Sequence, residues 1–252
     1  MAFSWRFKKQ FLYSVIFFVI ILAIIGFFVL RFMSGGTCFD NKQNQNEEGT
    51  DCGGNCKPCQ ENIKELTVLW KRFFAAGENA YETAAVIENP NLIWGIETLN
   101  YKFKLYDQNN ILIAVKGGTT FLNPNDRIFI FEPKFDIKER RPHRATIEFD
   151  DIKWKFIEKM SPNLIVIKKD FYDRAGLSIL EVEVKNNSLE NVENIYVGAA
   201  LLDENENAFA ASQTKIDKIN PEGSGKAVFT WGQIFQQKPA KIDIFIKTKI
   251  KD

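Results

Sequence analysis

The segment Leu99-Asn-Tyr-Lys-Phe-Lys-Leu-Tyr-Asp107 alternates apolar with polar side chains over most of its length. Successive side chains of a β-strand point to opposite faces, so this alternation predicts a strand with one face in a core. The side chains expected in the core are Tyr101, Phe103 and Leu105, and those expected outside it are Lys102, Lys104 and Tyr106. The turn-forming run Asp107-Gln-Asn-Asn110 follows at once, which predicts that the strand ends in a hairpin.

Similar short runs fill the chain from residue 62 onward, and turn residues separate them. They include Leu99–Tyr106, Ile111–Val115, Arg127–Phe131, Ile179–Val184, Ile195–Leu202 and Lys241–Lys247. No stretch of this part has the apolar spacing of an amphipathic helix of about 10–15 residues. Strands of this length, with turns every 8–15 residues or so, predict an all-β protein of the sandwich type.

This part of the chain also repeats itself at an offset of about 97 residues. The matching segments are Leu66–Phe74 with Asn163–Phe171, Asn89–Asn91 with Asn186–Ser188, and Asn123–Asn125 with Asn220–Glu222. The shared order of turns and strands predicts two tandem domains, residues 62–158 and 159–252. Each has the size of an immunoglobulin-like β-sandwich.

The run Phe103-Lys-Leu105-Tyr106-Asp107, with its flanking Asn-Pro turns, carries a resemblance to a known family. It resembles the small bacterial β-sandwiches named for their F-x-L-Y-D motif, and the related late-embryogenesis-abundant-like sandwiches. Leu201-Leu202-Asp203 is a degenerate second copy. The resemblance implies an immunoglobulin-like fold with a binding or envelope-spacing role, and it supplies no catalytic residues.

Near the N-terminus, Phe11–Leu30 is a run of 20 residues without a charge. As a helix it would extend about 30 Å, the thickness of the hydrocarbon core of a bilayer. A buried core helix is rarely apolar on every face. Leu30–Met33 lacks the small residues of a signal-peptide cleavage site, and Gly35–Cys38 matches a lipoprotein site poorly. We therefore predict that residues 11–33 are a single transmembrane helix whose partner is the lipid bilayer.

The charges at this end predict the orientation. Arg6, Lys8 and Lys9 precede the apolar run, whereas only Arg31 follows it closely. By the positive-inside rule, residues 1–10 are a cytoplasmic flank of the cytoplasmic membrane and residues 34–252 are exported. The whole chain has a formal charge of +1 and no strongly basic region, so we expect no nucleic-acid partner.

Residues 34–61 form a cysteine-rich tether. Its four cysteines have the spacing C-x13-C-x3-C-x2-C and are Cys38, Cys52, Cys56 and Cys59. In an exported segment we expect disulfides, and four cysteines allow three pairings. A zinc site made of all four thiolates, and redox chemistry at Cys56-Lys-Pro-Cys59, are the alternatives.

The same tether is rich in carboxylate and amide oxygens, which are the ligands that Ca²⁺ prefers. The candidate calcium ligands are Asp40, Asn44, Glu47 and Asp51. Asp and Asn also form turns, so the sequence leaves both interpretations open. The segment resembles a short module of secreted and surface bacterial proteins, C-x-D-G-x-x-N-x-x-E-x-G-x-D-C-G-G-x-C-x-x-C. It departs at Asn41, where the module has Gly, but Asn tolerates the left-handed conformation.

The sequence contains few candidate catalytic groups. The adjacent carboxylates Asp150-Asp151 point to opposite faces of a strand, and the single histidine, His143, has no nucleophile beside it in the sequence. We therefore expect no enzymatic activity. One basic loop stands out, and we expect its side chains to be exposed; they are Lys138, Arg140, Arg141 and Arg144. It is either a solvated loop or a contact for an anionic envelope polymer or lipid headgroups.

Together these features predict a non-catalytic, membrane-anchored protein of a bacterial cell envelope. It would display two immunoglobulin-like domains for binding, spacing or assembly, with a protein or an envelope polymer as partner outside the cell. The alternatives are an accessory subunit of a membrane enzyme, secretion or transport complex, and a metal or redox protein acting through the cysteine segment.

Overall fold

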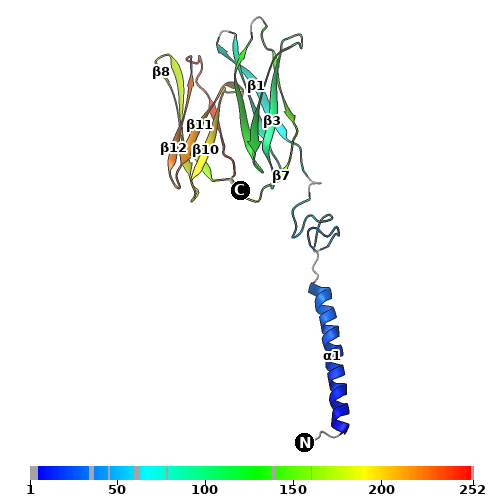
Figure 1. Cartoon of the computed structure of the whole chain (residues 1–252). Helices are drawn as coiled ribbons and strands as arrows, with labels where there is room; N and C mark the ends of the chain where they lie inside the picture. Colours follow the sequence, from blue (N-terminus) through cyan, green and yellow to red (C-terminus); the bar gives the residue numbers. More distant parts are fainter. Residues whose placement is uncertain are drawn as a thin grey trace. The chain divides into compact units, whose positions relative to one another are not determined.

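The computed structural model describes residues 5–33, 37–44, 46–59, 63–77, 79–137, 140–159 and 161–250. The chain forms two compact units, Met1–Asn62 and Ile63–Asp252. The first unit contains one long helix and the cysteine segment, and the second is built of strands (Figure 1). The protein is therefore all-β apart from an N-terminal apolar helix, as the alternating sequence predicts.

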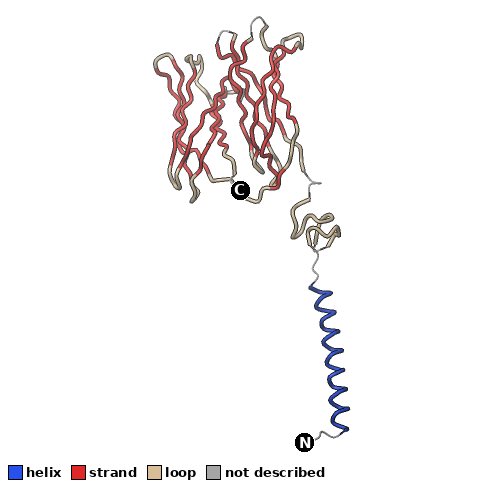
Figure 2. The backbone as a smooth tube through the Cα atoms, in the orientation of Figure 1, coloured by secondary structure: helices blue, strands red, loops and turns tan. Residues whose placement is uncertain are grey.

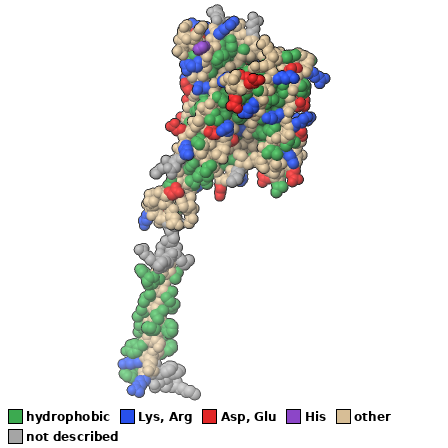
Figure 3. Space-filling model, turned by 180° about the vertical axis from the view of Figure 1, so that it is seen from behind, with side chains coloured by type: hydrophobic (Ala, Val, Ile, Leu, Met, Phe, Trp, Pro, Cys, Tyr) green, Lys and Arg blue, Asp and Glu red, His purple; other side chains and the backbone are tan. Residues whose placement is uncertain are grey.

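Helix α1 runs from Trp5 to Met33, and its window Lys9–Val29 is apolar enough and long enough to cross a membrane. No side chain of that window is buried against the rest of the chain; Phe17, Leu22 and Phe27 are all more than 60% exposed. Apolar side chains cover the helix along its length, and lysine and arginine lie at its N-terminal end (Figure 3). A helix that is apolar all round needs a bilayer or a protein partner to cover it.

The first sandwich contains strands β1–β7. Their bounds are Thr67–Gly77, Ala80–Glu88, Trp94–Tyr106, Leu112–Leu122, Arg127–Asp136, Arg144–Asp150 and Lys155–Phe156. One sheet has the order β1-β2-β5 and the other β4-β3-β6, with the short β7 paired to β3. All pairs are antiparallel, and the first core lies between these two sheets.

The second sandwich contains strands β8–β13. Their bounds are Leu164–Arg174, Leu177–Asn186, Val192–Leu202, Ala208–Ile219, Ser224–Trp231 and Lys241–Lys247. Its sheets, β8-β9-β12 and β11-β10-β13, repeat the order of the first sandwich strand for strand. Both sandwiches belong to the compact unit Ile63–Asp252, so the division into two domains, 62–158 and 159–252, stays a prediction.

The motif strand β3 alternates as expected. Tyr101, Phe103 and Leu105 are at most 7% exposed, whereas Lys102 and Lys104 form ion pairs on the outer face, with Asp150 and Glu148. The motif aspartate closes the hairpin, because Asp107 Oδ1 accepts hydrogen bonds from the backbone N–H groups of Asn109 and Ile111. Asp203 does the same in the second sandwich, for Asn205 and Asn207.

A buried asparagine marks the end of the second strand in each sandwich. Asn89 donates to the carbonyls of Trp94 and Asn123, and Asn186 donates to those of Glu190 and Asn220. These amides are at most 1% exposed, and their oxygens accept bonds from Asn91 and Ser188. Each asparagine thus joins two loops at one end of its sandwich by satisfying their backbone groups.

The two sandwiches pack face to face, β1-β2-β5 against β11-β10-β13 (Figure 2). We call this contact the inter-sandwich interface. Its buried side chains are Phe74, Ala84, Val86, Phe129, Ala200, Leu202, Ala208 and Ala211. The residues that alternate with them, such as Ala85 and Ile87 on β2, face the first core instead. The central strands β2 and β10 are therefore buried on both faces, and they contain unbroken apolar runs at residues 84–87 and 197–202.

Phe129 lies at the centre of the inter-sandwich interface. Its ring stacks on Phe245 with a centroid distance of 5.3 Å and meets the edge of Trp70 at 6.1 Å. Gly198 of β10 lies directly beneath it. A Cβ at position 198 would fall 2.7 Å from Phe129 Cγ and 2.9 Å from its Cβ, so the ring fits only because glycine has no side chain.

Gly198→Ala should lower the free energy of unfolding by about 1–3 kcal/mol, because the added methyl group overpacks the interface. Gly232→Ala is the matched control, since nothing lies within 4 Å of a Cβ at that position; its effect should stay within about 0.5 kcal/mol. Denaturant unfolding of the full-length protein in detergent, followed by tryptophan fluorescence, measures both. Equal midpoints for the two variants would show that the contact is not tight.

Candidate functional site

The four cysteines of the tether form two disulfides, Cys38–Cys56 and Cys52–Cys59. Their Cα atoms are 5.5 Å and 4.9 Å apart, within the usual range for disulfides. The two bonds interleave along the chain and hold a segment too poor in apolar residues to form a core. Cys56 and Cys59 have different partners, so they do not form a C-x-x-C disulfide with each other. None of the described cysteines is free, so none offers a thiolate to zinc.

The acidic side chains of the tether are hydrogen-bonded to its own backbone. Asp51 accepts from the N–H groups of Asp40 and Asn41, and the almost buried Glu47 accepts from those of Asn44 and Asp51. Asn41 has a φ of 56°, so asparagine adopts the left-handed conformation here, as the sequence suggests. The Asn44 amide donates to Asp40 at 2.9 Å and is the main cause that holds the pKa of Asp40 below its usual value.

These contacts bear on the calcium hypothesis for Asp40, Asn44, Glu47 and Asp51. Among the described residues, the acidic or cysteine side chains that converge are Cys38, Glu47 and Cys56, and both sulfurs belong to a disulfide. Asn44 Oδ1 is buried without a hydrogen-bond partner. Calcium binding therefore stays a prediction, centred on that oxygen and the neighbouring carboxylate of Asp40.

Calorimetric titration of the full-length protein with Ca²⁺ tests this hypothesis. If Asn44 Oδ1 and Asp40 ligate the ion, saturable binding should appear in the wild type and weaken by roughly tenfold or more in Asp40→Asn, which removes a charged ligand. Glu65→Gln, outside the tether, is the charge-matched control and should bind like the wild type. A wild type that binds no Ca²⁺ at millimolar concentration contradicts the hypothesis.

The basic loop lies between β5 and β6 and contacts the β3–β4 hairpin of the first sandwich. Arg140, Arg141 and Arg144 are exposed as expected, while Lys138 lies outside the described residues. Arg140 forms an ion pair with Asp107 at 3.0 Å, and the Arg144 guanidinium lies 4.4 Å from the centre of the Tyr106 ring. The pKa of Asp107 is held below its usual value, mainly by the hydrogen bond from the N–H of Ile111. The N–H of Asn109 and the charge of Arg140 contribute less. Two of the arginines thus support the hairpin, and a surface contact for the loop stays a prediction.

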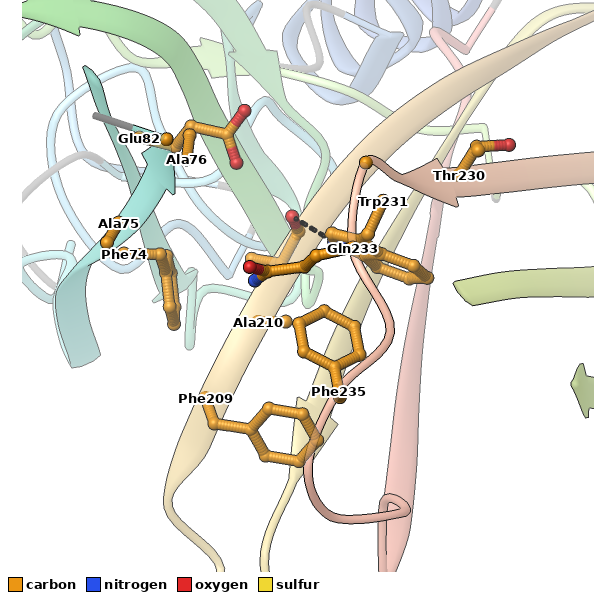
Figure 4. Close-up of a pocket in the computed structure, with 13 residues that line it drawn as sticks. Phe74, Ala75, Ala76, Glu82, Phe209, Ala210, Thr230, Trp231, Gln233 and Phe235 are labelled. Carbon is orange, nitrogen blue, oxygen red and sulfur yellow. Dashed lines mark hydrogen bonds between the residues drawn. The ribbon is translucent and has the colours of Figure 1, made fainter. Parts of the chain in front are cut away.

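The structure also contains a groove that the sequence does not reveal, at one edge of the inter-sandwich interface (Figure 4). We call it the interface groove; it has a volume of about 200 Å³. One wall is the end of β1 with Glu82 of β2, and the other is the start of β11 with the loop after β12. Its lining includes the aromatic and polar side chains of Phe74, Glu82, Phe209, Trp231, Gln233 and Phe235.

Aromatic side chains form one wall of the interface groove. Phe235 meets Trp231 and Phe209 edge to face, with centroid distances of 5.7 Å and 5.3 Å. Trp231 Nε1 donates to the Ala211 carbonyl at 3.2 Å, which fixes the indole ring. The loop after β12 is held by Ser178, whose N–H donates to the Gln233 carbonyl and whose hydroxyl accepts from the N–H of Phe235. The wall is therefore preformed.

Glu82 brings a carboxylate to this apolar site. It lies opposite Phe74 in the β1–β2 register, and Figure 4 shows its carboxylate and the Gln233 side chain extending into the space between the walls. Partial burial raises the pKa of Glu82, and no charge among the described residues opposes that shift. No lysine or arginine of the described chain forms an ion pair with it. A carboxylate in such surroundings is a binding group for a cation.

A second cavity of about 120 Å³ lies within the inter-sandwich interface, beside Lys247. The Lys247 amine donates to the Thr120 hydroxyl and lies 4.7 Å from the centre of the Phe121 ring. Burial lowers the pKa of Lys247 to about 8, although Asp126 opposes the shift. This lysine is a buried amine between the sandwiches, and its ionisation is linked to their stability.

No protein-family model matches the chain, and no curated protein matches it. Among solved structures, the crystal structure of red sea bream transglutaminase aligns with 74% of this chain and 29% of that one, at 9% sequence identity and a TM-score of 0.24. The chain thus spans less than a third of the transglutaminase, and this alignment supports no inference about activity.

Burial of the Lys247 amine makes the stability of the fold depend on pH. The unfolded chain keeps the Lys247 proton up to a pH near the ordinary value of 10.5, whereas the folded chain loses it at about 8. Between these values the unfolded state binds more protons, so the contribution of Lys247 to the free energy of unfolding rises with pH. Lys247→Met should remove this rise, and the exposed Lys226→Met should keep it. Denaturant unfolding at about pH 7 and about pH 10 compares them; identical pH dependence in the two variants contradicts the linkage.

Proposed function

We propose that this chain is a non-catalytic protein of a bacterial cell envelope, anchored in the cytoplasmic membrane by α1. Its two sandwiches act outside the membrane in binding or assembly. The observation that carries the proposal is the helix itself. Its apolar window of 21 residues has none of its side chains buried, and it belongs to a compact unit separate from the strands.

The charges and the disulfides support the direction of insertion. Arg6, Lys8 and Lys9 lie at the N-terminal end of α1, which favours a cytoplasmic N-terminus. The two disulfides of the tether persist in an oxidising compartment, so they favour export of everything after the helix. The resemblance of Phe103–Asp107 to the F-x-L-Y-D sandwiches, and of the tether to the surface-protein module, points to the same setting.

We favour a role in binding or assembly over simple display because the two sandwiches bury their facing sheets against each other. The inter-sandwich interface joins the two sandwiches into one compact unit, so the unit presents its preformed interface groove as a whole. Partners of this protein are then a protein or an envelope polymer. The accessory-subunit alternative shares the same anchor and differs only in having a membrane complex as the partner.

A fractionation experiment tests the anchor. Full-length protein expressed in bacteria should sediment with membranes and resist extraction by carbonate, because a helix of this length inserts stably. A cleaved signal sequence would instead release residues 34–252 as a shorter, soluble species, and that outcome would contradict anchoring.

The orientation needs a separate measurement. Protease added to intact spheroplasts should digest the sandwiches of the wild type, while a cytoplasmic marker stays protected. In the variant Arg6→Glu, Lys8→Glu, Lys9→Glu, the fraction digested should fall sharply, because the positive flank that retains the N-terminus is gone. If the wild-type sandwiches are protected until the membrane is opened, the exported topology is contradicted.

A further inference from the structure

The interface groove has the chemistry of a site for a cationic side chain. Its aromatic wall offers ring faces and edges to an aliphatic stem and its charged end, as in the sites where lysine or arginine packs on aromatic residues. Glu82 supplies a negative charge on the opposite wall. A neutral ligand would leave that carboxylate half-buried and unpaired, and an anion would be repelled by it.

The strand beside the groove shows how a partner could present such a side chain. β1 is an edge strand that pairs with β2 alone. Its last residues, Ala75, Ala76 and Gly77, are exposed and line the groove. An extended segment that adds to this edge would direct alternate side chains toward the groove. The short side chains of Ala75 and Ala76, and the absence of one at Gly77, leave room for a neighbouring backbone.

We propose that the interface groove binds a lysine or arginine side chain of an extended segment of a partner protein, with Glu82 as its counter-charge and Phe74, Trp231 and Phe235 as its walls. The volume of about 200 Å³ fits one such side chain and not a folded domain. This proposal rests on the binding role proposed above and adds the chemistry of the partner. Both sandwiches contribute to the site, so it exists only when the inter-sandwich interface is formed.

The test uses full-length protein in mild detergent and two probe peptides, acetyl-Thr-Val-Lys-Val-Thr-amide and the same peptide with norleucine in place of lysine. Binding is followed by calorimetry and by the intrinsic tryptophan fluorescence, to which Trp231 of the groove contributes. The lysine peptide should bind saturably, and Glu82→Gln should weaken that binding by about tenfold or more. Glu65→Gln removes an exposed charge outside the groove and should leave the affinity unchanged.

The norleucine peptide completes a double-mutant cycle. It should bind weakly and equally to the wild type and to Glu82→Gln, because it lacks the charge that Glu82 recognises. Thermal unfolding confirms that Glu82→Gln still folds, which is expected since no described cation pairs with Glu82. The proposal is overturned if the lysine peptide fails to bind at millimolar concentration, or if it binds Glu82→Gln as well as the wild type. Neither result depends on membrane insertion, so failure here is distinct from failure of the anchor.

Discussion

The contact of Phe129 with the backbone of Gly198 is the constraint on which the packing of the two sandwiches depends. An aromatic ring fills the centre of the interface, and a glycine on the facing strand gives it the space. Because the two sandwiches meet there, the central strands β2 and β10 have apolar side chains on both of their faces. The interface groove and the burial of Lys247 both follow from this contact, since each lies where residues of the two sandwiches come together.

The fold within each sandwich could be predicted because its rules are local. Alternation placed Tyr101, Phe103 and Leu105 in the core, and the turn residues placed the hairpins that Asp107 and Asp203 close. Face-to-face contact between the sandwiches could not be predicted in this way, because alternation tells which face is buried and not what covers it. Its signal was present in the unbroken apolar run Ala84–Ile87, where a strand with one wet face would alternate.

The candidate sites were predicted less well, for a related reason. Phe74, Glu82, Trp231 and Phe235 are distant in sequence and meet only when both sandwiches have folded and packed. Spacing alone allowed three disulfide pairings, and the choice depends on how the tether folds around Glu47 and Asp51. The oxygens suggested for calcium also accept bonds from the tether backbone, so one residue type serves turn formation and ligand chemistry equally well.

The inter-sandwich interface joins unlike faces: β1-β2-β5 of one repeat meets β11-β10-β13 of the other, the counterpart of β4-β3-β6. Head-to-tail contacts of this kind do not close on themselves and can in principle continue as a filament. The outward faces of the two outer sheets, β4-β3-β6 and β8-β9-β12, carry charged side chains at the equivalent positions. Lys102 and Lys104 occupy the places of Gly198 and Ala200, and Glu181 and Glu183 those of Ala84 and Val86. The two outward faces of the pair therefore carry charge where the buried faces carry glycine, alanine and valine, and this charge opposes a further contact of the same kind.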